Sequence, residues 1–444
     1  MSAITAKLQQ QALLVMLLAC SISLCLYWRD VPGALQMGTA DAGSTKAKPL
    51  TDLYPRWYGA RELLLHHRDP YGPEVSREIQ IAYYGRALNP ALASDRLDQK
   101  RFAYPAYVVF LMAPTIFMAF PTVQIVFWWL LAAVAASSIW FWLRFLRLHL
   151  TGTALVAVFT LGLTCLPMLQ GLNLLQLGVV VAGLIASASL CLVSGHFFLA
   201  GTLLAIATIK PQMSFFPIAW FLLWALGAWE LRKSLTWGFG VGLLTLVLAS
   251  EYLLPGWLMR YPSALAAYSE YQYAPPLLST LLPRAAFWVS SILAVLGVTV
   301  FCWRVRQSPA DSVWFAIALL FVMTLTVSVL PTVNALFNQV LLFPAILLGI
   351  RYRRFLTQGS RINQLIFYLI CGCGFLPWML AGILMVVRPN VHDKLYLAMW
   401  SAPLYSSFGL PVVVFLFLIL LCRALAAESP DEPEDASLAG AGAL

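Results

Sequence analysis

The chain has 444 residues, of which 61% are hydrophobic and only 11% are charged. Soluble domains are about half apolar and a quarter charged, so this composition excludes an ordinary soluble domain and indicates an integral membrane protein. The formal net charge is +9, but the basic residues cluster in short gaps between apolar blocks, so no nucleic-acid partner is expected.

The apolar residues form continuous blocks, most of them long enough to cross about 30 Å of hydrocarbon as helices. Backbone groups in lipid must be paired internally and the blocks do not alternate, so we expect an all-α polytopic protein rather than a β-barrel. The expected blocks are Gln11–Trp28, Phe102–Phe120, Val123–Leu143, Thr153–Leu169, Leu174–Val193, Phe197–Ile209, Phe215–Trp229, Leu235–Leu254, Ala285–Trp303, Ser312–Leu330, Ala335–Ile350, Gln364–Val387 and Leu395–Leu421.

The first block follows a short start that carries Lys7, and it is either a signal anchor or a cleavable signal peptide. The longest polar stretch comes next, over residues 29–101, and it is extracytoplasmic if Lys7 is cytoplasmic. Residues 1–425 are expected to form one transmembrane domain. The acidic tail over 426–444 contains several Pro and Gly residues and is expected to be disordered in the cytoplasm.

The basic gaps predict the sidedness of the helices, because short cytoplasmic loops are rich in Lys and Arg. A full crossing by Phe102–Phe120 would put every later basic gap on the wrong side, and this block contains Pro105 and Pro114. We therefore expect it to be re-entrant or surface-lying, which leaves about twelve crossings with both termini cytoplasmic. The gaps assigned to the cytoplasm carry Arg144, Arg147, Arg232, Lys233, Arg304, Arg306, Arg351, Arg353, Arg354 and Arg361.

Two ionisable residues on the expected outer face are the main functional candidates. Lys210 ends an apolar helix just before Pro211, where its ammonium either meets an anionic lipid head group or snorkels to the interface. Asp52 follows the first block among aromatic residues, where it either serves as a base or caps the next helix, expected near Tyr58. The surrounding tyrosines and tryptophan fit sugar stacking or an interfacial aromatic belt.

No common soluble catalytic motif is present in the sequence. It has no Walker loop, dinucleotide fingerprint or nucleophile elbow, and His66 and His67 lack the spacing of a metal pair. The eight cysteines are scattered in or beside apolar blocks and are interpreted as apolar filler. No metal and no cofactor are expected.

The order of several short motifs resembles a known family. These motifs are Asp52 after the first helix, Arg68-Asp69-Pro70-Tyr71, Phe102-Ala103-Tyr104-Pro105, Gln170-Gly171-Leu172-Asn173, Ala200-Gly201 and Ile209-Lys210-Pro211. Together they resemble the polyprenyl-phosphate-mannose-dependent alpha-mannosyltransferases, glycosyltransferase family 87 of the GT-C superfamily. One departure is that the family's usual Gly-Gln pair reads Gly171-Leu172 here, which removes a side-chain amide.

The resemblance implies a GT-C-type helix bundle in a bacterial inner membrane. It implies transfer of a hexose, mannose in the family, from a polyprenyl-phosphate sugar to a hydroxyl of a lipid or glycan acceptor, with inversion. Asp52 is then the general base, and Lys210 holds the donor phosphate with help from Arg260 and Arg284. The expected substrate contacts are Tyr71, Tyr104, Gln170, Asn173 and Glu270.

Two other classes of function are open. A secondary transporter or a flippase for lipid-linked sugars is the main alternative, although such folds often contain internal repeats and the sequence shows none. A non-catalytic membrane scaffold is the second alternative, but it does not require Asp52 and Lys210 on one face.

Overall fold

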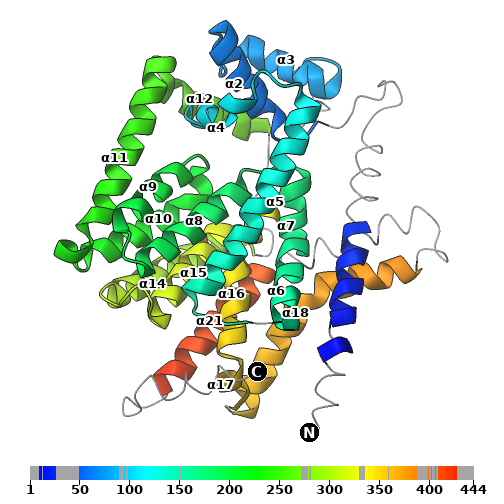
Figure 1. Cartoon of the computed structure of the whole chain (residues 1–444), viewed down its shortest axis with the longest axis vertical. Helices are drawn as coiled ribbons and strands as arrows, with labels where there is room; N and C mark the ends of the chain where they lie inside the picture. The colour runs from blue at the N-terminus through cyan, green and yellow to red at the C-terminus, as the bar shows by residue number, and fades with distance from the viewer. Residues whose placement is uncertain are drawn as a thin grey trace.

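A computed structural model of the chain shows only helices among its described residues, arranged as in Figure 1. The predicted helical membrane protein is confirmed at this level, because several of the helices are long and apolar enough to cross a membrane. The structure describes residues 10–12, 14–26, 50–89, 95, 99–150, 152–271, 279, 282–329, 336–358, 360–387, 399, 402, 406 and 409–427.

A layer of mostly short helices lies at one end of the molecule, at the top of Figure 1. Its first helix begins at Tyr54, four residues before the expected start, because Pro55 fits the first helical turn, where a missing N–H costs nothing. We call these helices the outer layer. They are α2 (Tyr54–His66), α3 (Pro73–Tyr84), α4 (Val108–Met112), η2 (Ala113–Thr115) and α12 (Trp257–Tyr271).

The sequence predicts that the segment Phe102–Phe120 is not a spanning helix, and the structure agrees. It holds only the five residues of α4 and the three of η2, with Pro114 in the first turn of η2. The segment is hydrogen bonded to α2, because the indole N–H of Trp57 donates to the carbonyl of Thr115 at 3.1 Å. The segment therefore belongs to the outer layer.

The remaining helices form a bundle below the outer layer. Within the described part of the chain, five spans are long and apolar enough to cross a membrane, namely α5, α11, α14, residues 361–384 of α18, and α21. The bundle helices are α5 (Phe120–Phe145), α6 (Gly152–Thr164), α7 (Leu166–Asn173), α8 (Gly178–Val193), α9 (Phe197–Ala207), α10 (Pro211–Leu226), α11 (Trp229–Leu253), α14 (Arg284–Val305), α15 (Val313–Val329), η3 (Leu336–Leu342), α16 (Phe343–Arg351), α17 (Arg353–Gln358), α18 (Arg361–Val387) and α21 (Leu410–Ala427).

The expected block Thr153–Leu169 is a broken helix rather than one straight span. Helices α6 and α7 meet at 54° and count as a sixth candidate span if taken together. Cys165, between them, has an extended backbone, and Pro167 lies in the first turn of α7. Proline cannot donate to the preceding turn and its ring clashes there, so the helix breaks. The other apolar blocks give shorter helices, including α8, α9, α10 and α15.

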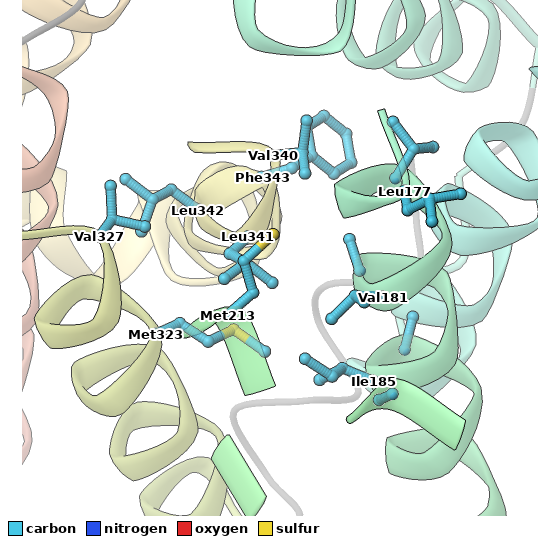
Figure 2. Packing of buried hydrophobic residues seen from close by; sticks show 14 of the residues in the cluster. Leu177, Val181, Ile185, Met213, Met323, Val327, Val340, Leu341, Leu342 and Phe343 are labelled. Carbon is cyan, nitrogen blue, oxygen red and sulfur yellow. The ribbon is translucent and has the colours of Figure 1, made fainter. Parts of the chain in front are cut away.

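A hydrophobic core fills the bundle, and Figure 2 shows the part of it between α8, α10, α15 and η3. Val181 and Ile185 of α8 face Met213 of α10 and Met323 of α15 in this region. Helices α9 and α11 approach so closely that a Cβ atom on Gly238 would lie 2.1 Å from the carbonyl oxygen of Phe198. Small residues permit such contacts between membrane helices.

The basic gaps between helices contact one another, at the end of the bundle where α17 lies in Figure 1. Arg147 pairs with Asp311 at 2.5 Å, Arg232 donates to the carbonyl of Arg306, and Arg351 donates to that of Leu146. The structure thus gathers the gaps that the sequence assigns to one side of the membrane.

Candidate functional site

Asp52 lies directly before α2, and hydrogen bonds engage both of its carboxylate oxygens. The ammonium of Lys100 donates to Oδ1 at 2.7 Å, and the side-chain amide of Gln176 donates to Oδ2. The N-cap of α2 is Leu53, and no side chain caps this helix end. The interpretation of Asp52 as a helix cap is therefore wrong.

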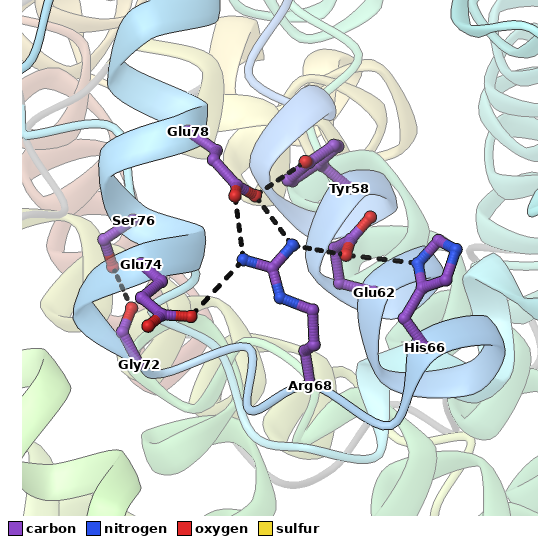
Figure 3. A network of polar contacts seen from close by, with 8 residues as sticks. All are labelled: Tyr58, Glu62, His66, Arg68, Gly72, Glu74, Ser76 and Glu78. Carbon is purple, nitrogen blue, oxygen red and sulfur yellow. Dashed lines mark hydrogen bonds and ion pairs between the residues drawn. The ribbon is translucent and has the colours of Figure 1, made fainter.

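A network of ion pairs and hydrogen bonds holds α2 against α3 (Figure 3). Arg68, in the loop between these helices, donates to Glu62 of α2 at 2.8 Å and to Glu78 of α3 at 2.8 Å. Tyr58 donates its hydroxyl to Glu78 at 2.8 Å. Because Arg68 bridges the two helices, it holds the C-terminal half of α2 against α3.

Arg56 brings a second positive charge beside Asp52. Its guanidinium donates to the backbone carbonyl of Asp52 and lies 4.3 Å from the centre of the Tyr104 ring. Tyr104 is held in turn by Tyr71, whose buried hydroxyl donates to the Tyr104 carbonyl at 2.6 Å. The structure therefore brings the predicted substrate residues Tyr71 and Tyr104 to the site. There the Tyr104 ring contacts Arg56, and Tyr71 holds Tyr104.

Lys210 lies in the turn between α9 and α10, and only 3% of its surface is exposed. Its ammonium donates to the side-chain oxygen of Asn338 at 2.8 Å and to that of Gln176 at 3.5 Å, and lies 4.5 Å from the centre of the Phe337 ring. A snorkelling lysine keeps its charge in water. This buried, hydrogen-bonded ammonium does not fit that interpretation.

Gln176 joins Asp52 to Lys210 through one amide group. Its nitrogen donates to Asp52 while its oxygen accepts from Lys210. Gln176 lies in the turn from α7 to α8, directly after Leu175, whose backbone is left-handed with a φ of 51°. Gly178 leaves room for the contact, since a Cβ atom there would lie 3.3 Å from the Lys210 ammonium.

The site contains more basic side chains than acidic ones. Arg56, Lys100 and Lys210 surround the single carboxylate of Asp52. Burial acts to raise the pKa of the Asp52 carboxyl, but the charges of Lys100 and Arg56 and the hydrogen bonds from Lys100 and Gln176 bring it below its usual value. Burial, with the charge of Arg56, lowers the pKa of Lys210 to about 7. The site therefore holds an ionised carboxylate and a surplus of positive charge, which favours an anionic ligand.

The other residues predicted at the donor phosphate lie apart from these contacts. Arg260 of α12 pairs with Asp69 at 2.9 Å and is 43% exposed. Arg284 is exposed at the start of α14. Neither arginine has a contact with Lys210 or Asp52 among the described residues, so the structure does not bring them to the site.

Gln170 and Asn173, two further predicted substrate contacts, have no described contact with Asp52 or Lys210. Asn173 is exposed at the end of α7, and Gln170 is partly buried, with a side-chain oxygen that lacks a hydrogen-bond partner in the described part of the chain. Glu270 belongs to α12, but its side chain is outside the described residues. Across the described residues, no group of three or more His, Cys, Asp or Glu side chains could hold a metal ion.

Comparison with known proteins adds no family assignment. No family model matches the chain, and no curated protein matches it. The arrangement of Asp52, Gln176 and Lys210 is therefore interpreted from its own chemistry.

Lys100, Gln176 and Asn338 are site residues that the sequence analysis did not select. Gln176 and Asn338 lie inside blocks interpreted as apolar, and an amide side chain inside such a block is the signal that could have identified them. Lys100 comes from a polar loop where charged residues are common, so no sequence signal separates it from its neighbours. Gln176 also supplies a side-chain amide of the kind that the Gly171-Leu172 pair lacks.

Proposed function

We propose that the protein is a membrane glycosyltransferase that moves a hexose, with mannose the first candidate, from a polyprenyl-phosphate donor to an acceptor hydroxyl. The observation that carries this proposal is the link from Asp52 through Gln176 to Lys210. This link joins a carboxylate and a buried ammonium through one side-chain amide. The motif resemblance to glycosyltransferase family 87 selects the same two residues independently.

The chemistry of the transfer matches the charges of the site. Asp52 accepts the proton of the acceptor hydroxyl while the acceptor oxygen bonds to the anomeric carbon of the sugar. The bond from that carbon to the phosphate oxygen breaks, and its electron pair leaves with the polyprenyl phosphate. Attack opposite the leaving group inverts the anomeric centre. Lys210 stabilises the charge that develops on the phosphate.

The proposed topology puts this site at the extracytoplasmic face of a bacterial inner membrane. The basic gaps that meet at the far end of the bundle support a cytoplasmic assignment for that end. About twelve crossings, with both termini cytoplasmic, then require several of the shorter apolar helices to cross along with the longer spans. The outer layer faces the periplasmic side in this arrangement.

A donor panel tests the proposal. The purified protein is incubated in liposomes with radiolabelled polyprenyl-phosphate hexoses and membrane lipid extract, and the label in new lipid or glycan products is measured. We expect transfer from at least one polyprenyl-phosphate sugar, and loss of transfer in the Asp52→Asn variant. Movement of the intact donor between leaflets, without a new glycosidic bond from any donor, would instead support a transporter or flippase.

A further inference from the structure

A mostly apolar groove lies between the α6–α7 break, η3, α16, α18 and the start of α21. It contains about 600 Å³ of open space, within the range of about 300–1,000 Å³ that is common for ligand pockets. None of the described residues that line it carries a charge, so the groove suits a neutral ligand. We call it the η3 groove, and its lining includes Pro167, Gln339, Phe343, Gly374, Pro377 and Trp378.

Helix η3 separates this groove from the candidate site. Asn338 accepts a hydrogen bond from Lys210 at 2.8 Å, and the next residue, Gln339, lines the groove. Successive residues of a 3₁₀-helix point about 120° apart, so η3 presents different sides to the two places. Asp52, Gln176 and Lys210 do not line the groove. The η3 groove is therefore a second site, which the proposed sugar transfer does not use.

Two polar side chains of the groove are buried without a hydrogen-bond partner in the described part of the chain. Oε1 of Gln339 is an unpaired acceptor and the indole N–H of Trp378 is an unpaired donor, and the two residues are 2% and 7% exposed. Buried polar atoms are nearly always paired, because an unpaired one has lost its water without compensation. This donor and this acceptor indicate a ligand that supplies the missing partners.

Helix α18 adds a backbone acceptor to the same wall. Pro377 lies inside this helix and has no N–H, so it cannot donate to the carbonyl of Cys373, four residues earlier. Both residues line the groove. Gly374 follows Cys373 directly, and a Cβ atom on it would meet no neighbour within 4 Å. The wall is therefore open next to this carbonyl.

We propose that the η3 groove binds a neutral membrane lipid with a free hydroxyl, of the monoacylglycerol or diacylglycerol kind. Helix α18 includes a span that is long and apolar enough to cross a membrane, and hydrocarbon offers no hydrogen-bond partner. A hydroxyl can accept from the Trp378 indole and donate to Gln339 or to the Cys373 carbonyl, while the acyl chain covers the apolar wall. A bare polyprenyl chain has no such group. This inference does not depend on the proposed function.

Photolabelling of the purified full-length protein in liposomes tests this site. The probe is a monoacylglycerol with a diazirine in its acyl chain, and its diacetate ester is the matched probe that lacks hydroxyl donors. Label on peptides from η3 and α18 is measured by mass spectrometry. We expect the monoacylglycerol to label these peptides about five- to tenfold more than the diacetate, since one hydrogen bond contributes about that factor to binding.

Substitutions at two glycines of α18 locate the bound lipid. Gly374→Phe should fill the groove and reduce labelling by the monoacylglycerol to the level of the diacetate. Gly372→Phe is the matched control, because this glycine is outside the groove lining and also has no neighbour within 4 Å, and it should label as wild type. Gly374→Leu serves in the same way if Gly374→Phe does not fold.

The two unpaired side chains should affect the probes differently. Gln339→Leu removes the acceptor and should lower the preference for the monoacylglycerol over the diacetate. Trp378→Phe removes the donor and should weaken labelling by both probes, because ester oxygens also accept. Equal labelling of the wild type by the two probes would overturn the proposal and favour a lipid chain without a hydroxyl. Undiminished labelling of a folded Gly374→Phe protein would overturn it as well.

Discussion

Asp52 and Gln176 are hydrogen bonded side chain to side chain, although 124 residues separate them in the chain. The same Gln176 amide accepts from Lys210, so the carboxylate and the buried ammonium share one connecting group. Glutamine suits this position because its side chain has both donors and an acceptor. A carboxylate in its place would repel Asp52, and an apolar residue would remove one hydrogen bond from each of the two partners.

Replacing Gln176 by leucine should therefore impair catalysis while the size of the side chain is nearly kept. Hydrogen bonds to charged groups contribute about 1.5–3 kcal/mol, so kcat/KM should fall by about 10- to 100-fold. Sugar transfer by the purified variant measures this. Gln124→Leu, at a partly exposed position near the start of α5, is the matched control and should retain activity. Full activity in a folded Gln176→Leu variant would show that the bridge is not needed.

Lys210 should make donor binding depend on pH. Its pKa is lowered to about 7 in the free site, and a bound phosphate raises that pKa again. The protonated form therefore binds the donor better, so the donor Kd should be lowest below pH 7 and rise by as much as about tenfold per pH unit above it. A titration of a polyprenyl-phosphate sugar at several pH values measures this effect.

The Lys210→Ala variant is the control for that titration. Its donor affinity should be weaker at all pH values and lack the rise above pH 7, whereas acceptor KM should change less. Lys210→Arg should retain part of the affinity, because the charge is kept but the geometry is not. A wild-type profile with no change in donor affinity across pH 7 would contradict this role for Lys210.

Replacing Gly178 should affect donor binding more than the stability of the fold. A Cβ atom there would lie 3.0 Å from Sδ of Met213 and 3.3 Å from the Lys210 ammonium, and both are ends of flexible side chains. Gly178→Ala should therefore displace Lys210 and raise the donor KM several-fold, with little change in Tm. Gly240→Ala in α11 has no neighbour within 4 Å and should leave the donor KM unchanged. Equal effects of the two variants would contradict this account of Gly178.

The sequence predicts the helical membrane class and the break in Phe102–Phe120, and it selects Asp52 and Lys210, which the structure joins through Gln176. These features follow from continuous apolar blocks, from prolines, and from charges in unusual places. The contacts of Asp52 could not be predicted, because they depend on how distant turns meet. The kink before Pro167 could have been predicted from that proline, and the start of α2 from Pro55. The donor-phosphate roles expected for Arg260 and Arg284 came with the family resemblance, and the described contacts of these arginines do not include Lys210 or Asp52.

The membrane topology gives a separate prediction. A reporter fused after Arg354 should be cytoplasmic, because Arg351 and Arg353 lie with the other basic gaps at one end of the bundle. A small tag inserted after Glu270 should be extracytoplasmic. Accessibility to a membrane-impermeant label in intact cells distinguishes the two sides. If both positions report the same side, the proposed orientation is wrong.

Asp52 is proposed as the base for sugar transfer, and the Asp52→Asn substitution tests this role most directly. Asparagine keeps the size of the side chain but cannot accept the acceptor's proton. Base catalysis contributes about 10²–10⁴-fold, so single-turnover transfer from the polyprenyl-phosphate sugar should slow by about that factor while donor binding persists. Asp69→Asn, which removes another carboxylate of the outer layer at its ion pair with Arg260, should transfer at nearly the wild-type rate. Wild-type turnover by a well-folded Asp52→Asn protein would contradict the account.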